Sequence, residues 1–218
     1  INRGGVRQFM AVPYAASPAG FSRWRPPSER EPWDVPLNAS KGSVLCAGNL
    51  ACQKAGNCTE DCLVLDVYTP LEIHCANLPV MVFFPGGGFI TGCNDCEGDT
   101  LNASSLVLMR HVVVVSVNYR LGAFGWLALE GIGIRGNFGL MDQRSSLQWV
   151  QRNIHRFGGD PSFVTVWGES AGAMSIGAHM ASNKSQGLYS AAIMESNPVG
   201  ISYKSMSGAN HVGRRFVS

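Results

Sequence analysis

The sequence feature that most constrains the fold is a serine between two glycines, where an apolar strand gives way to a helix of small residues. The motif GESAG occupies residues 168–172, after a β-branched and aromatic run at 163–167 and at the start of a helix expected over 170–180. Such a sharp turn holds its serine in a strained backbone conformation, with Oγ exposed above the sheet edge. A Cβ on either side would clash with a neighbouring strand or helix, so glycine is needed there. The pattern predicts that Ser170 is a nucleophile.

A run of three glycines follows a second buried strand. The apolar run at 79–84 leads through Pro85 into glycines 86–88, where backbone N–H groups can approach a substrate oxygen without side-chain obstruction. A phosphate-binding loop would need a Gly-Lys-Ser or Gly-Lys-Thr sequence, which the chain lacks. The N–H groups of Gly87 and Gly88, with that of Ala171 at the start of the expected helix, are predicted to form an oxyanion hole.

The apolar runs along the chain alternate between strand and helix patterns. Continuous valine-rich runs are typical of strands that are covered on both faces. The order predicts an α/β fold with a mostly parallel central sheet and helices on both faces. Neither an internal repeat nor a linker divides the chain, so one domain over residues 1–218 is expected. The expected strands lie at 6–12, 62–68, 79–84, 111–118, 163–167 and 190–194, and the expected helices at 100–110, 137–156 and 170–180.

Composition and charge exclude several classes of protein. The chain is 45% hydrophobic and 15% charged, and its 17 basic and 15 acidic residues give a net charge of +2. This balance excludes a disordered or highly charged binding protein, and no basic stripe is present for a nucleic-acid partner. The longest apolar runs fall far short of the roughly 20 residues of a membrane-spanning helix. The spacing of His and Cys does not fit a zinc site, so neither a metal nor a cofactor is predicted.

Cysteines and glycosylation sequons indicate the secretory pathway. Seven cysteines lie in the first half of the chain, at positions 46, 52, 58, 62, 75, 93 and 96. Clustered cysteines with several Asn-x-Ser/Thr sequons are typical of folding in an oxidising compartment, so a secreted or lumenal location is expected, although the chain contains no signal peptide. The odd number leaves at least one thiol unpaired or paired outside the chain. The candidate glycosylation sites are Asn38, Asn57, Asn102 and Asn183.

Several long motifs occur in the order that one known family shows. They are EDCLVLDV at 60–67, GGGF at 86–89, NYRLGAFG at 118–125, GNFGLMDQ at 136–143, and the stretch at 157–172 from FGGDP to GESAG. From about residue 5 to beyond residue 196, the chain closely resembles the type-B carboxylesterase/lipase family of α/β-hydrolases, which includes the cholinesterases. The resemblance implies an α/β-hydrolase fold and a serine ester hydrolase that acts on a small carboxylic ester through an acyl-enzyme.

The resemblance also implies roles for individual residues. The nucleophile and the oxyanion donors predicted above keep those roles, and Glu169 would be buried and hydrogen-bonded. The sequence departs from the family at Pro85, where His or an aromatic residue is usual, but the backbone N–H groups of the glycine loop remain available. Two buried ion pairs, which would position loops rather than add much stability, are Arg23 with Glu60 and Arg120 with Asp142.

A disulfide that closes a loop ending at Cys62 is implied in the same way. Its partner would be Cys46 or Cys52, between which spacing does not choose, and Cys58 would pair with the other. The CNDC motif that begins at Cys93 has no thioredoxin-like context, so a redox motif is disfavoured. The structural disulfides favoured there are Cys93 with Cys96 or Cys93 with Cys75.

The partners of a catalytic triad are not supplied by an obvious motif. A hydrolase of this type needs an acid and a His after the serine, and the candidates are Glu195, His179 and His211. The helix that begins at Ser170 would point His179 away from the site, and the family has its acid and His far downstream. The expectation is that the chain is the front half of a hydrolase fold, inactive by itself.

Two functions from different classes fit these features. The intact nucleophile and glycine motifs favour an ester hydrolase. The alternatives are a non-catalytic, cholinesterase-like protein of adhesion or binding, or an inactive fragment without the acid and His. The loop at 47–61 has no aromatic residue. This argues against a choline-ester specialist, because cholinesterases hold a quaternary ammonium there by cation–π attraction. The sequence predicts neither an acyl-pocket size nor an oligomeric state.

Overall fold

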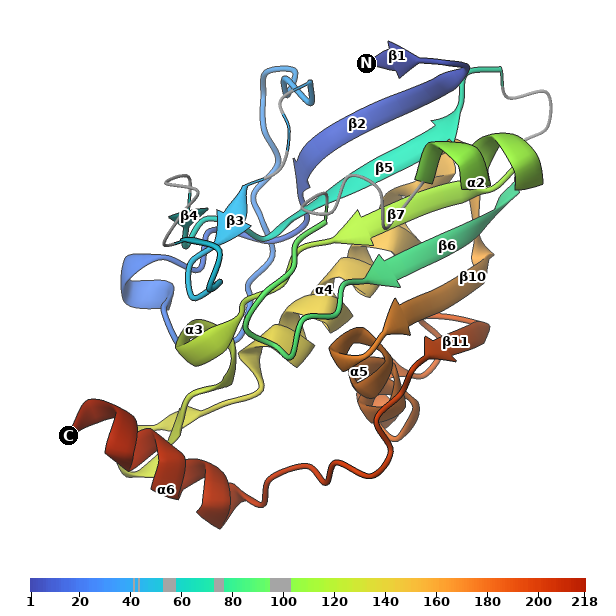
Figure 1. The fold of residues 1–218 in the computed structure, drawn as a ribbon. Helices are drawn as coiled ribbons and strands as arrows, with labels where there is room; N and C mark the ends of the chain where they lie inside the picture. The colour runs from blue at the N-terminus through green and yellow to red at the C-terminus, as the bar shows by residue number, and fades with distance from the viewer. Residues whose placement is uncertain (41, 43, 53–57, 73–76, 95–102) are drawn as a thin grey trace.

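A seven-stranded sheet forms the centre of the molecule (Figure 1). The computed structural model describes residues 1–40, 42, 44–52, 58–72, 77–94 and 103–218. In sheet order the strands are β1 (Asn2–Arg3), β2 (Val6–Pro13), β5 (Val64–Pro70), β7 (Val113–Val117), β6 (Leu78–Phe84), β10 (Gly159–Glu169) and β11 (Ala191–Glu195). The last four run parallel to one another, whereas β1, β2 and β5 join the sheet in antiparallel pairs.

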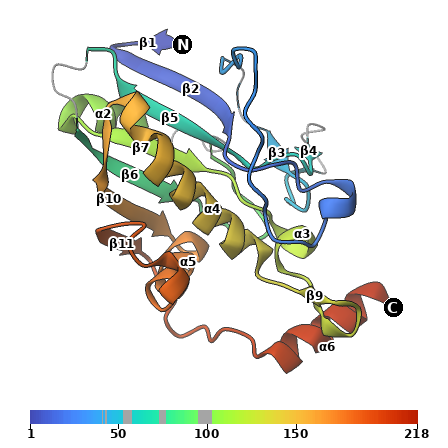
Figure 2. The same ribbon diagram turned by 180° about the vertical axis from the view of Figure 1, so that it is seen from behind.

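Helices cover both faces of this sheet, as Figures 1 and 2 show from opposite sides. One face carries α2 (Ala103–Arg110), and the other carries α4 (Phe138–Asn153) and α5 (Ala171–Met180). Alternate valines of β7 divide between two core clusters: Val114 joins the cluster of α2, and Val115 joins that of α4 and α5. Both faces of β7 are therefore buried, which accounts for its continuous valine run.

Most expected strands and helices are present, and β10 departs furthest from its prediction. The sequence pattern predicts a turn at 158–161 and a strand at 163–167, but β10 already begins at Gly159. Its register against β6 shifts between Gly159 and Val164. The first part of β10 is thus irregular, and its residues lack the apolar run by which the rest of the strand was recognised.

Short elements lie around the ends of the sheet. The strands β3 (Leu45–Cys46) and β4 (Cys58–Thr59) pair with each other, and so do β8 (Ala128–Leu129) and β9 (Ile134–Arg135). α6 (Met206–Val217) packs on β8, and both figures show it at the end of a long connection from β11. The remaining short helices are α3 (Gly122–Trp126), η1 (Gly20–Ser22), η2 (Glu130–Ile132), η3 (Ile154–Phe157) and η4 (Asn183–Ser185).

The strand β11 forms an apolar outer edge of the sheet. In the described residues it pairs with β10 alone, and its Ile193 and Met194 side chains are 42% and 40% exposed. The 218-residue polypeptide, produced by itself, is expected to self-associate, because an open apolar edge can pair with another chain. Size-exclusion chromatography should show Ile193→Lys raising the monomer fraction. A soluble wild-type monomer that melts in one sharp transition would contradict this prediction.

Candidate active site

Ser170 lies at the junction of β10 and α5, in a backbone conformation that few residues adopt. Its φ is 52° and its ψ is −116°, a region that is strained for a residue with a Cβ. Its N–H donates to the carbonyl oxygen of Glu195 in β11 at 3.0 Å, and its own carbonyl accepts from the N–H of Met174 in α5 at 2.9 Å. Hydrogen bonds from two elements thus hold the strained residue, which is half-buried.

Close backbone contacts explain the glycines on either side of this serine. A Cβ on Gly168 would lie 2.8 Å from the carbonyl oxygen of Phe84. A Cβ on Gly172 would overlap the same oxygen and press on the backbone of Pro85. The first turn of α5 therefore packs directly on the end of β6, at a distance that no side chain at these two positions would permit.

The glycine loop after β6 lies beside Ser170. A Cβ on Gly86 would lie 3.4 Å from the Cβ of Ser170. Gly87 and Gly88 follow with φ angles of 101° and 61°, and both are exposed. Because left-handed conformations of this kind favour glycine, the loop borders the serine with backbone rather than with side chains. The structure brings together the nucleophile and the glycine loop that the sequence predicts.

Side chains outside the glycine loop anchor both of its ends. The hydroxyl of Tyr119 donates to the carbonyl oxygen of Pro85 at 2.6 Å. Burial raises the pKa of Tyr119, so the phenol stays protonated and can donate. Phe89, at the other end, packs on Trp126 with ring centroids 4.5 Å apart. Sequence reasoning missed Tyr119, which lies inside a family motif but has no local pattern of its own.

No described histidine hydrogen-bonds to Ser170. Glu195 is exposed at the end of β11 and contacts the serine through its backbone carbonyl. His211 is exposed on α6, whose Asn210 donates to the Glu130 carboxylate in η2 at 2.9 Å. This bond fixes α6 beside the β8–β9 hairpin, away from β11 (Figures 1 and 2). The described residues therefore do not bring the side chains of Glu195 and His211 to Ser170, so they do not form a triad of serine, acid and histidine.

His179 lies on the buried face of α5 and ties this helix to its neighbours. Its Nδ1 is 2.9 Å from Ser185 Oγ, and its Nε2 is 3.2 Å from Gln143 Oε1 in α4. Gln143 Nε2 donates to Ser175 Oγ at 3.1 Å, and that hydroxyl donates to the carbonyl of Ala171 at 3.0 Å. His179 thus bonds to Ser185 and Gln143 rather than to Ser170, and it holds α5 against α4.

Burial and the charge of Arg144 lower the pKa of His179 to about 4. An unfolded histidine titrates near 6.5, so the unfolded chain binds the proton first. The stability that neutral His179 contributes above pH 6.5 is therefore lost as the pH falls towards 4. Between pH 8 and pH 5 the free energy of unfolding should fall by about 2 kcal/mol for this reason.

Denaturant unfolding of the full-length protein at pH 8 and pH 5 measures this loss. The His179→Gln variant should lose this part of the pH dependence, because glutamine cannot take up the proton. His211→Gln is the control, since His211 is exposed, and it should behave as the wild type does. Equal pH dependence in the wild type and in His179→Gln would contradict the prediction.

The ion pair of Arg120 and Asp142 is buried, as the resemblance implies. Arg120 Nε and Nη2 donate to the two carboxylate oxygens at 2.8 and 2.7 Å, and both side chains are almost fully buried. Arg120 Nη1 also donates to the carbonyl oxygen of Arg25 at 2.9 Å. The pair therefore fixes the segment around residue 25 against α4, and its geometry satisfies most of the donors of the guanidinium.

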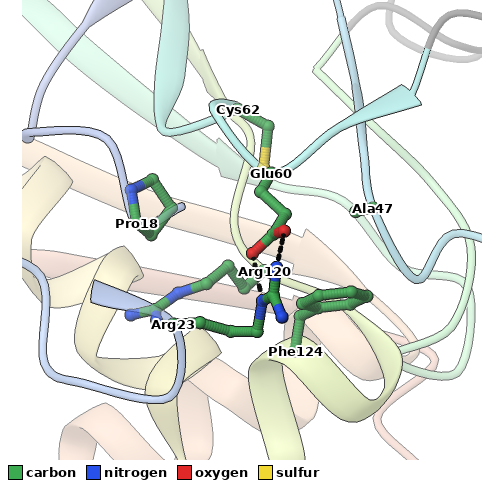
Figure 3. Close-up of a pocket in the computed structure, with 7 residues that line it drawn as sticks. All are labelled: Pro18, Arg23, Ala47, Glu60, Cys62, Arg120 and Phe124. Carbon is green, nitrogen blue, oxygen red and sulfur yellow. Dashed lines mark hydrogen bonds and ion pairs between the residues drawn. The ribbon is translucent and has the colours of Figure 1, made fainter. Parts of the chain in front are cut away.

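The ion pair of Arg23 and Glu60 is present but is not buried, so the expectation of burial was wrong. The two side chains are 40% and 20% exposed, and Arg23 Nε donates to the carboxylate at 2.7 Å. The pair lies in a shallow surface crevice, shown in Figure 3. Because both side chains are partly exposed, water screens the two charges and the attraction adds little stability. The crevice is also lined by Pro18, Ala47, Cys62, Arg120 and Phe124.

The expectation of a buried Glu169 was also wrong. This residue is exposed at the end of β10. Its carboxylate is close to Gly86: a Cβ added to that glycine would lie 2.8 Å from Glu169 Oε2. Glu169 thus lies against the glycine loop. The strand beyond it, β11, is the edge of the sheet, so nothing in the described part of the chain covers the carboxylate from that side.

Two nested disulfides close the loop that precedes β5. The bonds are Cys46–Cys62 and Cys52–Cys58, with sequence separations of 16 and 6. Of the two partners that the sequence left open for Cys62, the structure has Cys46. Cys93 is also disulfide-bonded, whereas Cys75 and Cys96, the two partners considered for it, lie outside the described residues.

Peptide mapping of the full-length protein without reduction should recover Cys46 linked to Cys62. Closing a loop of this length stabilises the fold by about 3 kcal/mol, because it restricts the unfolded chain. The double variant Cys46→Ser/Cys62→Ser should therefore unfold at a lower denaturant concentration than the wild type. Recovery of Cys46 and Cys62 as free, alkylated thiols would contradict the pairing.

The remaining sequence candidates fall on exposed or undescribed positions. Asn38 and Asn183 are exposed, whereas Asn57 and Asn102 lie outside the described residues. Within the described ranges, no group of three or more acidic, His or Cys side chains could hold a metal ion. No helix in those ranges is both long enough and apolar enough to cross a membrane.

Comparisons with known proteins agree on one family. The sequence model described as "Carboxylesterase family" matches residues 1–217. A pyrethroid hydrolase, Ces2e of Rattus norvegicus, is 40% identical over 89% of this chain and 36% of that protein. The acetylcholinesterase of Danio rerio is 42% identical over 89% of this chain and 32% of its own length. A solved thermophilic PNB esterase has a TM-score of 0.91 and 36% identity, covering 100% of this chain and 45% of the esterase. The chain thus spans about a third of the curated relatives that it matches.

Proposed function

The chain belongs to the carboxylesterase family and has an α/β-hydrolase fold, and from this premise we propose that the full-length protein hydrolyses carboxylic esters with Ser170 as its nucleophile. The observation that carries the proposal is the strained Ser170, with φ 52°, at the start of α5 and beside the glycine loop. A strained residue at this point is the geometry that exposes a serine hydroxyl at the top of such a sheet.

In the proposed reaction, Ser170 Oγ attacks the ester carbonyl carbon while a base accepts the hydroxyl proton. The carbonyl electrons move to the oxygen, and the N–H groups of Gly87, Gly88 and Ala171 stabilise the resulting oxyanion. Collapse of this intermediate expels the alcohol, which takes a proton, and leaves an acyl-enzyme that water then hydrolyses. The base and the acid that orients it are assigned to residues of the full-length protein other than the described histidines, none of which hydrogen-bonds to Ser170.

The substrate that we propose is a small carboxylic ester without a quaternary ammonium group. Residues 47–61 carry no aromatic side chain, so this loop has no ring face to attract such a cation. We also propose that the protein folds in the secretory pathway. The disulfides Cys46–Cys62 and Cys52–Cys58 support this location, because such bonds persist in oxidising compartments.

Labelling with a fluorophosphonate tests the proposal, since this probe reacts with an activated serine. The full-length protein should be labelled on the peptide that contains Ser170 and should hydrolyse p-nitrophenyl acetate. The 218-residue polypeptide by itself should do neither, because no described histidine hydrogen-bonds to the serine. A full-length protein that is neither labelled nor active would instead support the non-catalytic binding function.

A further inference from the structure

The disulfide-closed loop makes two hydrogen bonds to residues 90–92, the segment that follows the glycine loop and Phe89. The backbone N–H of Leu50 donates to the carbonyl of Ile90 at 2.8 Å, and Asn49 Nδ2 donates to the carbonyl of Gly92 at 2.9 Å. Asn49 is 3% exposed, although it lies in a loop. A buried side-chain amide is stable only when its polar atoms are hydrogen-bonded, and here one of those bonds holds Gly92.

The glycine loop is closed by bonds to a single carbonyl. The carbonyl oxygen of Gly87 accepts from the N–H of Ile90 at 3.1 Å, from the N–H of Thr91 at 3.0 Å and from Thr91 Oγ1 at 3.1 Å. The peptide bond between Gly87 and Gly88 is planar and trans, so the Gly88 N–H points opposite to this carbonyl. The positions of Ile90 and Thr91 therefore determine where the Gly88 N–H points.

Asn49 is itself held on all sides. Its N–H donates to the carbonyl of Cys46 at 3.1 Å, and its carbonyl accepts from the N–H of Cys52 at 3.0 Å. Its Oδ1 accepts from the N–H of Ala51 at 2.9 Å. This bond orients the amide so that Nδ2 donates to the carbonyl of Gly92. Because each of the two cysteines belongs to a different disulfide, the amide is fixed by both.

We propose that Asn49 is a positioning residue for the oxyanion hole. Its amide fixes Gly92, which immediately follows Thr91, and through Thr91 it fixes the direction of the Gly88 N–H. This inference rests on the proposed ester hydrolysis, but it adds a residue that does not touch substrate. Because the oxyanion forms only in the transition state, Asn49 acts on kcat and leaves substrate binding nearly unchanged.

The test uses Asn49→Asp in the full-length protein, with p-nitrophenyl acetate as substrate. Aspartate keeps the acceptor for Ala51 but turns a second acceptor towards the Gly92 carbonyl, so the loop is pushed away. Loss of one oxyanion donor outright costs about 100-fold or more in kcat, so displacement of one is expected to cost about 10-fold. KM should stay within about 2-fold, since ground-state binding is not affected. Asn49→Ala, which removes the donor without adding repulsion, should fall between wild type and Asn49→Asp.

Two measurements separate positioning from a loss of folded protein. Fluorophosphonate titration counts active sites, so kcat is expressed per intact site. The affinity for a trifluoromethyl ketone, which forms an oxyanion on the enzyme, should fall in parallel with kcat/KM across the variants. Leu50→Ala is the matched control, because Leu50 is 54% exposed and its hydrogen bond to the Ile90 carbonyl is made by its backbone. It should keep the kcat and the ketone affinity of the wild type.

An active wild type whose Asn49→Asp variant keeps its kcat per site and its ketone affinity would overturn the inference and leave the proposed function standing. Activity lost only in proportion to titrated sites would overturn it too, because Asn49 would then be merely structural. A wild type that hydrolyses no ester and takes no fluorophosphonate would overturn the proposed function and this inference together.

Discussion

Ser170→Ala is expected to abolish ester hydrolysis by the full-length protein and to remove labelling by a fluorophosphonate. Alanine keeps the Cβ of the side chain but removes the hydroxyl oxygen that would form the acyl-enzyme. Loss of the nucleophile in a serine hydrolase lowers kcat by about 10⁴-fold or more, since only the oxyanion hole and substrate binding remain. Initial rates with p-nitrophenyl acetate, and labelling followed by mass spectrometry, measure the two losses.

The variant should remain folded, because both hydrogen bonds of Ser170 are made by its backbone. Thermal unfolding is therefore measured beside activity, so that a loss of structure is not mistaken for a loss of chemistry. Ser207→Ala serves as the control, since Ser207 is exposed on α6, and it should keep full activity and full labelling. Full esterase activity in Ser170→Ala would show that another residue is the nucleophile.

The parts of the structure that sequence predicted well are those with a local cause. The valines of β7 form a continuous run because both faces of the strand are covered, and that run is visible without any knowledge of the partners. The turn at Ser170 also leaves a local pattern: its contacts are with the distant Phe84, but they require glycine at two positions, 168 and 172, that flank the serine. In both places one physical requirement acts on neighbouring residues, so it leaves a pattern in the sequence.

The parts that sequence did not predict depend on residues far apart in the chain. Gln143 lies within a helical pattern, and nothing near it indicates that it will bond His179, which is 36 positions away. Asn49 is one polar residue in a loop, and its role depends on Gly92. The exposure of Arg23 was missed for a similar reason, because the resemblance gives a partner but not the depth at which the pair lies.

The choice between disulfide partners shows the same limit. Cys46 and Cys52 lie at similar distances from Cys62 in the sequence, and a flexible loop would allow either bond. The fold decides, because β3 ends at Cys46 and pairs with β4, and the Cα atoms of Cys46 and Cys62 lie 5.1 Å apart. That separation is within the range that a disulfide requires.

Gly172→Ala is expected to cause the largest loss of stability among substitutions near the site. The added Cβ would overlap the carbonyl oxygen of Phe84, which belongs to the backbone of β6 and cannot turn aside as a side chain could. Overpacking a rigid contact costs about 3 kcal/mol or more. Any relief must lift the start of α5 from β6 and carry Ser170 with it, and a shift of about 1 Å at a catalytic group lowers kcat about 100-fold.

Gly177→Ala is the matched control, because it makes the same chemical change in the same helix. There the nearest atom to the new Cβ would be the hydroxyl of Tyr203 at 3.7 Å, an ordinary contact. Alanine forms helices more readily than glycine, so this variant should be as stable as the wild type or more stable by up to about 1 kcal/mol. Denaturant unfolding and kcat with p-nitrophenyl acetate compare the two variants. Equal stability and equal kcat for both would mean that α5 does not press on β6 at Gly172, and that glycine is present at position 172 for some reason other than this contact.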